Sequence, residues 1–224
     1  MNMHDLTADN IRKYPVNHKL VSKAVAAVLE QNVTPKLPNL FEAFKYCPYN
    51  NLKAVWVGQD PYPQEGVATG IAFANASDTK HLSKSLQILK DSVYSYLNKS
   101  EKEAIFDPSL MYWEEQGILM LNSSLSTVVG EIGKHTMIWR PVIADFLSKL
   151  SWIKPDLAYI LSGSTANSFK PYITDSIGII STVHPSFCAR TNTPFPDVFN
   201  ELNEALRTHG KEEVKWLREK QENS

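Results

Sequence analysis

Four short apolar segments constrain the fold of this 224-residue chain more than any other feature. Each has the length of a strand and ends at a polar or small residue, and the first is rich in β-branched and aromatic side chains. They cover residues 53–57, 117–122, 157–161 and 177–183. Because helical patterns and long loops separate them, they predict strands of one sheet covered on both faces. We therefore expect an α/β fold, with residues 1–224 as a single domain and a central four-stranded, mostly parallel sheet flanked by helices.

The predicted helices rest on apolar residues at helical spacing and on residues that begin or end helices. Asn17 is suited to cap a helix over residues 17–31, and Asp107-Pro108 precedes a short helix at 110–115. Further helices are expected near 40–44 and over 82–97, 139–150, 196–208 and 211–220. No internal repeat, low-complexity tract or linker divides the chain, as expected for one domain.

The composition is that of a globular protein, with 43% hydrophobic and 21% charged residues. No apolar run is long enough to span a membrane, and the N-terminus lacks the pattern of a signal peptide. Cys47 and Cys188 are too few for a four-thiolate zinc or iron–sulfur site and suggest a reducing compartment. We therefore expect a cytoplasmic, intracellular location, and the sequence leaves a nuclear or viral origin open. The net charge of −1 means that any nucleic-acid contact would need a local basic patch.

Polar residues follow all four predicted strands. Because the carboxyl ends of parallel strands meet at one edge of a sheet, these residues are expected to converge on one crevice. They are Gln59 and Asp60, Asn122, Gly163-Ser164 and His184-Pro185-Ser186. Pro61 restricts the backbone of Asp60 and so holds its carboxylate in place. Each feature alone is better explained by turn chemistry or a structural histidine, and only the combination predicts a site.

The pattern argues against several kinds of chemistry. Ser164 lacks the Gly-x-Ser-x-Gly elbow of a serine hydrolase, since Thr165 follows it and no glycine stands two positions after it. The strand ends carry too few histidines and carboxylates for a metal site. A phosphate-binding loop and a dinucleotide fingerprint are both absent. The remaining arrangement, a carboxylate opposite a neutral donor with an amide nearby, suits cleavage of a bond whose leaving group is a stabilised anion.

Five motifs occur in order along the chain: Gly58-Gln59-Asp60-Pro61-Tyr62, Gly70-Ile71-Ala72-Phe73, Leu121-Asn122, Gly163-Ser164 and His184-Pro185-Ser186. They resemble, in the same order, the motifs of the family 1 uracil-DNA glycosylases. The first is specific, because related glycosylase families carry another residue where Asp60 stands. The resemblance implies a monofunctional glycosylase that flips deoxyuridine out of single- or double-stranded DNA and hydrolyses its N-glycosidic bond. This releases uracil and leaves an abasic site for base excision repair, with no metal or organic cofactor.

The resemblance also implies the catalytic residues. Asp60 would orient or activate the attacking water and stabilise positive charge on the deoxyribose. A neutral His184 would donate a hydrogen bond to uracil O2 and stabilise the departing anion. No lysine stands in a matched catalytic position, so a Schiff-base lyase step is not expected.

Four further residues would form the base pocket in the same family. Asn122 would pair with O4 and N3–H of uracil and reject cytosine, whose donor and acceptor are reversed. Phe73 would stack on the flipped base, and Tyr62 would occupy the space that the C5 methyl of thymine needs. Gln59 would line the pocket, partly through its backbone.

DNA contacts are expected from short hydroxyl side chains, which let a protein approach phosphates closely. Ser85, Ser164 and Ser186 resemble the phosphate-contacting serines of the family. A local positive patch would come from Lys80, Lys84, Lys134, His135 and Arg190. A solvated surface charge is an equally good interpretation of the lysines.

Three departures from the family pattern bear on DNA binding. Pro63 stands where most members have histidine, a variant that also resembles poxviral members. The segment 81–85, His-Leu-Ser-Lys-Ser, lacks the usual proline pair, which puts the geometry of the phosphate contact there in question. Phe187-Cys188 replaces the usual Pro-Leu, whose leucine wedges into the base stack. Phe187 or Arg190 would then act as the wedge, unless Phe187 packs into the core.

Two alternatives remain open at this point. One is a DNA-binding accessory protein that kept the fold, although DNA binding alone does not require a uracil-shaped pocket. The other is a glycosylase for another lesion, which Tyr62 and Asn122 disfavour. The expected partners are uracil-containing DNA and a proteinaceous glycosylase inhibitor or a replication protein. We expect a monomer with no membrane contact.

Overall fold

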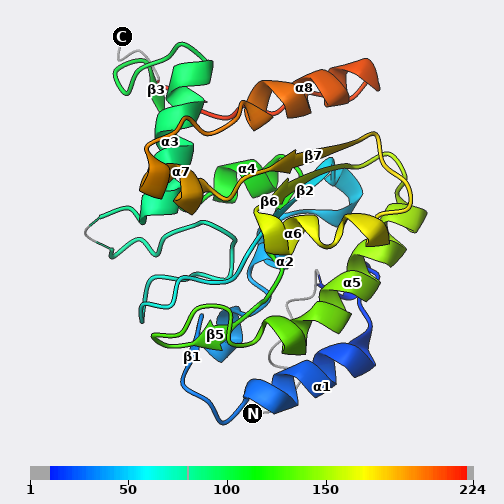
Figure 1. The fold of residues 1–224 in the computed structure, drawn as a ribbon. Coiled ribbons are helices and arrows are strands. Elements are labelled where there is room, and N and C mark those ends of the chain that lie inside the picture. The colour runs from blue at the N-terminus through cyan, green and yellow to red at the C-terminus, as the bar shows by residue number, and fades with distance from the viewer. Residues whose placement is uncertain (1–10, 80, 221–224) are drawn as a thin grey trace.

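Four parallel strands form the centre of the computed structural model, which describes residues 11–79 and 81–220. They occur in the spatial order β4-β2-β6-β7 (Figure 1). Their bounds are β2 (Ala54–Gly58), β4 (Ile118–Asn122), β6 (Ala158–Ser162) and β7 (Gly178–Thr182). Every residue of β2, β4 and β6 is buried, which is why these strands read as continuous apolar runs. The predicted α/β fold with one four-stranded sheet is confirmed, and the sheet is parallel throughout.

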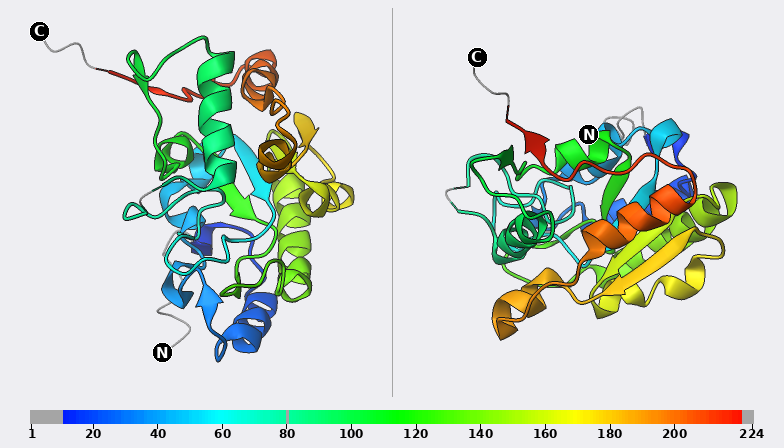
Figure 2. Two further views of the ribbon diagram at one scale, coloured as in Figure 1. Left: turned by 60° about the vertical axis from the view of Figure 1, so that its left-hand side comes forward. Right: turned by 90° about the horizontal axis from the view of Figure 1, so that it is seen from above.

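Helices cover both faces of this sheet (Figures 1 and 2). On one face, α1 and α5 pack against each other, and on the other Trp56 of β2 contacts Trp113 of α4 and Phe199 of α8. Helix α3 packs against α7 and α8. The helix bounds are α1 (His18–Val28), α2 (Ala43–Tyr46), α3 (Lys84–Tyr96), α4 (Met111–Glu115), α5 (Thr136–Ile153), α6 (Ser164–Asn167), α7 (Pro185–Thr191) and α8 (Val198–Thr208). None of the described helices is both long and apolar enough to cross a membrane.

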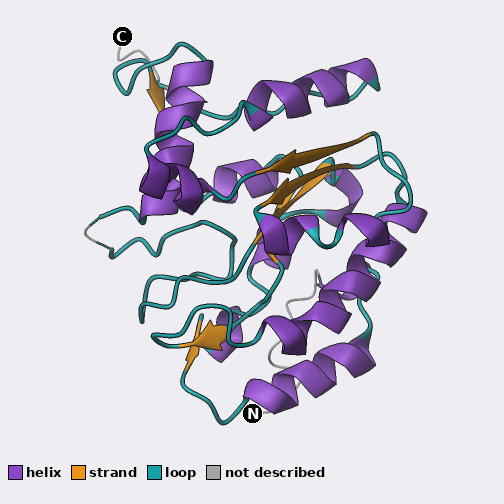
Figure 3. Ribbon diagram, in the orientation of Figure 1, coloured by secondary structure: helices purple, strands orange, loops and turns teal. Residues whose placement is uncertain are grey.

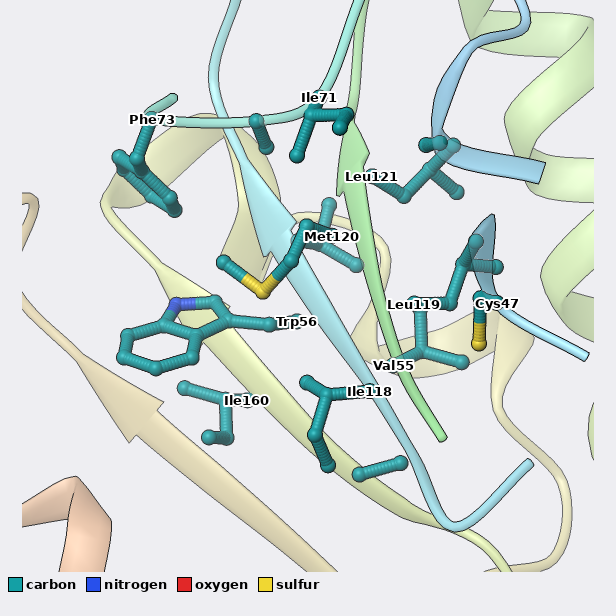
Figure 4. Close-up of a cluster of buried hydrophobic side chains, with 14 of the residues drawn as sticks. Cys47, Val55, Trp56, Ile71, Phe73, Ile118, Leu119, Met120, Leu121 and Ile160 are labelled. Atoms are coloured by element: carbon teal, nitrogen blue, oxygen red, sulfur yellow. The ribbon is translucent and has the colours of Figure 1, made fainter. Parts of the chain in front are cut away.

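Side chains alternate between the two faces of the sheet, as the pleat of a strand requires. Figure 4 shows Trp56, Met120 and Ile160 on one side of the strands, with Val55 and Leu119 on the other. The register agrees, because Trp56 pairs with Met120 on one neighbour and with Ile160 on the other. Large side chains of β2, β4 and β6 therefore lie in layers that the helices cover.

The register also brings the strand ends together. Gly58 pairs with Asn122, and Ser162 pairs with Thr182. The chain therefore leaves all four strands at one edge of the sheet. After β2 the described residues 59–79 and 81–83 are a long loop, drawn in teal in Figure 3, with an isolated bridge between Ala68 and Asn75.

The predicted helix over 211–220 is wrong. This segment is extended, and its end forms β8 (Arg218–Glu219), which pairs antiparallel with β3 (Ala104–Ile105). Val214 and Trp216 are buried whereas Lys215 between them is exposed, an alternation typical of extended chain. The Trp216 ring lies 5.1 Å from the Trp113 ring at 90°, and its carbonyl accepts the indole N–H of Trp113 at 2.9 Å. Tertiary packing thus overrides helix-forming composition.

Several elements were not predicted, and several predicted helices differ in their bounds. Helices α6 and α7 directly follow β6 and β7, and the short strands β1 (Val33–Thr34) and β5 (Thr127–Val128) pair antiparallel. Helix α5 extends beyond the predicted 139–150 at both ends, which places Pro141 inside it. Short 3-10 turns occur at Ile11–Lys13, Leu37–Asn39, Tyr49–Asn51 and Lys170–Tyr172.

Truncating Trp216 tests whether the extended C-terminal segment is part of the core. We expect Trp216→Ala to lower the free energy of unfolding by about 3–5 kcal/mol, because it removes a large buried ring from an aromatic cluster. Urea unfolding measures this, with Lys215→Ala as the exposed control, expected within about 0.5 kcal/mol of wild type. A loss below about 1 kcal/mol for Trp216→Ala would contradict the docking of this segment.

Candidate active site

A cavity of about 150 Å³ opens at the carboxyl edge of the sheet. A cavity of about this volume in another protein binds one benzene ring, so the space suits a single six-membered ring. Its wall comes from the loop after β2, the end of β4 and the start of α3 and α7. The predicted residues among its lining are Gln59, Asp60, Tyr62, Phe73, Ser85, Asn122, His184 and Ser186. Ala68, Ile71 and Ile132 also line it and were not predicted.

Gly58 allows two of these side chains to approach the strand. A Cβ atom at residue 58 would lie 2.8 Å from Asn122 Oδ1 and 3.0 Å from Phe73 Cζ. Asn122 is buried, and no described protein group hydrogen-bonds its amide. Its oxygen and its NH₂ group are therefore both available to the edge of a ligand.

Phe73 adopts a backbone conformation that is rare for an aromatic residue, with φ of 67°. The hydroxyl of Tyr62 donates a 2.8 Å hydrogen bond to its carbonyl. The Phe73 ring lies 5.9 Å from Trp56 and 5.5 Å from His184, tilted by 43° to the imidazole. The surrounding contacts thus hold a strained residue in place, a feature that often accompanies functional sites.

His184 ends the loop after β7 and caps α7. Its Nδ1 accepts the backbone N–H of Ser186 at 3.1 Å and lies 2.7 Å from the Ser186 hydroxyl. Because Nδ1 is an acceptor, the ring proton of the neutral imidazole must be on Nε2. Burial lowers the pKa of His184 from its usual 6.5 to about 4. Near pH 7 the residue is therefore a neutral hydrogen-bond donor.

Asp60 is fixed by the loop that follows β5. Its Oδ2 accepts the backbone N–H of Gly133 at 2.5 Å, and the N–H of Gly130 donates to the carbonyl of Pro63 at 2.8 Å. Burial raises the pKa of Asp60, and the bond from Gly133 opposes this by stabilising the carboxylate. One carboxylate oxygen is thus occupied, which leaves the other for a ligand or water.

His135 does not contribute to a positive surface, so that prediction is wrong. It is 1% exposed, and burial lowers its pKa. Its Nδ1 lies 2.9 Å from the hydroxyl of Ser126, which accepts the indole N–H of Trp139 at 2.8 Å. Its Nε2 lies 3.1 Å from Oε1 of Gln31, so the neutral ring donates there and accepts from Ser126. This buried network holds the loop that presents Gly133.

Chemically, the site combines an ionisable carboxylate, a neutral donor and an unpaired amide around space for one ring. The described part of the chain contains no group of three histidines, cysteines or carboxylates able to hold a metal ion. The arrangement suits stabilisation of a departing planar anion by His184 and of a developing cation by Asp60.

Curated proteins of two bacteria match most of the chain. Uracil-DNA glycosylase 1 of Listeria innocua is 32% identical over 211 residues, which cover 91% of this chain and 92% of that protein. The chain belongs to the uracil-DNA glycosylase family. The uracil-DNA glycosylase of Campylobacter jejuni subsp. doylei is 31% identical over 201 residues, or 88% and 85% of the two proteins. No model of a known protein family matches the chain.

Solved structures of uracil-DNA glycosylases share the fold. The mimivirus uracil-DNA glycosylase aligns with a TM-score of 0.74 at 24% identity, covering 92% of this chain and 83% of that one. A Y322L variant of the mimivirus protein, solved in complex with UGI, aligns with a TM-score of 0.79 at 24% identity, covering 96% and 91%. The predicted fold class is therefore confirmed by relatives as well as by topology.

Of the residues predicted to contact DNA, some line the cavity of this glycosylase and others lie outside it. Ser85 is buried and, with Ser186, lines the cavity, whereas Ser164 is exposed at the start of α6 and lies outside the lining. Phe187 is 41% exposed, so the alternative that it packs into the core is wrong. The guanidinium of Arg190 lies 5.8 Å from the Phe187 ring, and both side chains are exposed on α7.

The described lysines provide little support for a basic patch. Lys84 and Lys134 are exposed, and Lys134 pairs with Glu131 at 2.9 Å, which offsets its charge. Lys80 lies outside the described residues. Sequence reasoning also missed Gly133, because a backbone donor leaves no side-chain signal in a sequence.

The protonation state of His184 can be measured directly. We expect its imidazole to remain neutral, with the proton on Nε2, from pH 8 down to about pH 5, because its pKa is lowered to about 4. NMR of ¹⁵N-labelled histidine follows this titration. The exposed His209 serves as the internal comparison. A midpoint for His184 near 6.5 would contradict the buried, neutral geometry.

Proposed function

We propose that this chain removes uracil from DNA by hydrolysing the N-glycosidic bond of deoxyuridine, which leaves an abasic site. The observation that carries the proposal is that Asp60, Phe73, Asn122 and His184 line one cavity of about 150 Å³, space for a single pyrimidine. The names of its curated relatives support the same activity. A target base is unreachable inside a duplex, so the nucleotide must rotate out of the stack before it enters.

The cavity supplies groups that would recognise uracil. The oxygen of the Asn122 amide would accept uracil N3–H, and its NH₂ group would donate to O4. Cytosine presents the reverse pattern and would leave buried polar groups unpaired. Phe73 would stack on the base. Tyr62, held by its bond to the Phe73 carbonyl, would form the wall that excludes the C5 methyl of thymine, and Gln59 would complete the pocket.

In the proposed reaction the bond between C1′ of the sugar and N1 of uracil breaks, and its electron pair leaves with the base. The Nε2–H of His184 would donate to O2 of the departing anion. The carboxylate of Asp60 would stabilise the positive charge on the sugar and orient the water whose oxygen bonds to C1′. The proton that this water loses would pass to Asp60 or to solvent.

The DNA contacts are proposed from position, since Ser85 and Ser186 line the cavity and Ser164 is exposed at the start of α6. The hydroxyls of Ser85, Ser164 and Ser186 would contact phosphates on either side of the extruded nucleotide. Exposed Phe187, with Arg190 beside it, is the best candidate for the wedge that fills the space left in the stack.

The remaining expectations extend this proposal to partners and location. No metal or organic cofactor is required by the proposed reaction. A proteinaceous inhibitor is a reasonable partner, because a mimivirus relative was solved in complex with UGI. We further propose that the protein acts as a monomer in the cytoplasm, on single- or double-stranded DNA that contains uracil, with a replication protein as a second partner.

Uracil release from a uracil-containing oligonucleotide in EDTA tests the reaction and the roles together. Asp60→Asn and His184→Ala should each lower kcat by about 10²–10⁴, because each removes one preorganised charge or donor. The exposed Asp175→Asn and His209→Ala are matched controls and should leave kcat unchanged. Unchanged rates in both site variants would refute the assigned roles. Tight DNA binding without turnover by wild type would favour the accessory protein instead.

Gly58→Ala tests the shape of the pocket without removing a functional group. Its new Cβ would lie 2.8 Å from Asn122 Oδ1 and 3.0 Å from the Phe73 ring, so both must move. We expect kcat/KM to fall by about 10-fold or more, since small misplacements of binding groups are costly. Gly178→Ala is the control, because its Cβ would meet only Ala205 at 3.7 Å. Equal activity of the two variants would argue against a tightly shaped base pocket.

A further inference from the structure

Residues 81–83 form the backbone segment directly before α3, and α3 carries Ser85 into the cavity wall. The segment 81–85 lacks the proline pair that the family resemblance leads us to expect there. Proline stiffens a backbone by fixing φ, and this segment lacks that restraint. Something else must therefore hold the chain that leads into Ser85.

The side chain of Asn75 makes two hydrogen bonds to this segment and a third to Thr79, which precedes it in the chain. Its Nδ2 donates to Thr79 Oγ1 at 3.1 Å and to the His81 carbonyl at 3.3 Å, and its Oδ1 accepts the Ser83 N–H at 3.3 Å. A carbonyl can only accept and an N–H can only donate, so these partners fix the orientation of the amide. Thr79 gives its own hydroxyl proton to the carbonyl of Ala76 at 2.8 Å, which leaves its oxygen free to accept.

Asn75 is itself anchored. It is 4% exposed, its N–H donates to the Pro108 carbonyl at 3.2 Å, and it forms an isolated bridge with Ala68. It stands two positions after Phe73 in the chain. One buried side chain therefore connects the residue proposed to stack on the base with the segment that precedes Ser85.

We propose that Asn75 is a positioning residue that holds segment 81–83, and through it Ser85, in the geometry needed to contact a DNA phosphate. The proposal rests on the proposed function. It assigns to a side-chain amide the restraint that prolines would otherwise supply. Loss of the amide removes three hydrogen bonds and releases the segment, so Ser85 is no longer held in one position. His184 and Asp60 are held by other contacts and keep their positions.

A double-mutant cycle distinguishes positioning from a general loss of stability. The proteins are wild type, Asn75→Leu, Ser85→Ala and the double variant, assayed for kcat and KM on a single-stranded uracil oligonucleotide. Asn75→Leu and Ser85→Ala should each lower kcat/KM by about 10-fold to 100-fold, the usual range for a hydrogen bond to a charged group. The kcat/KM of the double variant should be no lower than that of the less active single variant, because both substitutions remove the same contact.

Asn203→Leu is the matched control. Asn203 is also buried and clamps a backbone segment, donating to the Val214 carbonyl at 3.0 Å and accepting its N–H at 2.8 Å, but it lies outside the cavity lining. It should lower the melting temperature as Asn75→Leu does, while leaving KM unchanged. Inhibition by free uracil should be the same in all variants, because the base pocket is intact. Should Asn75→Leu not fold, Thr79→Ala, which removes one of the three bonds, replaces it and should give a smaller loss in the same direction.

Two outcomes would overturn the proposal. One is independence, in which the losses from Asn75→Leu and Ser85→Ala multiply in the double variant. The other is an Asn75→Leu protein whose KM matches that of Asn203→Leu. The same cycle is run on the Kd for a fluorescent oligonucleotide. If wild type releases no uracil, the proposed function fails, and the coupling between Asn75 and Ser85 in Kd still decides the positioning role.

Discussion

The parallel register of the sheet is the constraint on which the rest of this structure depends. Because all four strands run in one direction, their carboxyl ends share an edge, and groups distant in sequence meet there. Asp60 and His184 come from the loops after β2 and β7, and Asn122 ends β4. Full burial of the inner strands makes the sheet a rigid base, so loops of varied conformation can present these groups accurately.

In the site, burial shifts the pKa values of two titratable groups in opposite directions. Burial makes the charged form of His184 costly, which keeps a neutral donor, and it raises the pKa of Asp60. Main-chain N–H groups then restrict each residue. Ser186 holds Nδ1 of the imidazole, and Gly133 stabilises the carboxylate. Fold and electrostatics thus jointly define which side chain donates a hydrogen bond and which accepts one.

Much of the fold and the site could be predicted because the signals were local and repeated. Apolar runs marked the strands, and the residues after them, such as Asp60 and His184, share the cavity as their topology required. What failed depended on tertiary contacts. The segment around Trp216 is extended because the core binds its ring, and His135 is buried although its side chain can carry charge. The restraint by Asn75 connects a side chain to backbone groups, which no sequence pattern records.

The hydrogen bond that restrains the Asp60 carboxylate has an evolutionary consequence. Its donor is the main chain of Gly133, where φ is +70°. Every residue except proline has a backbone N–H group, so a substitution at residue 133 by any other residue keeps the donor of this hydrogen bond. Selection at this position acts on backbone conformation and favours residues that tolerate a left-handed turn, such as glycine and asparagine. Relatives can therefore differ at this residue and still restrain the carboxylate in the same way.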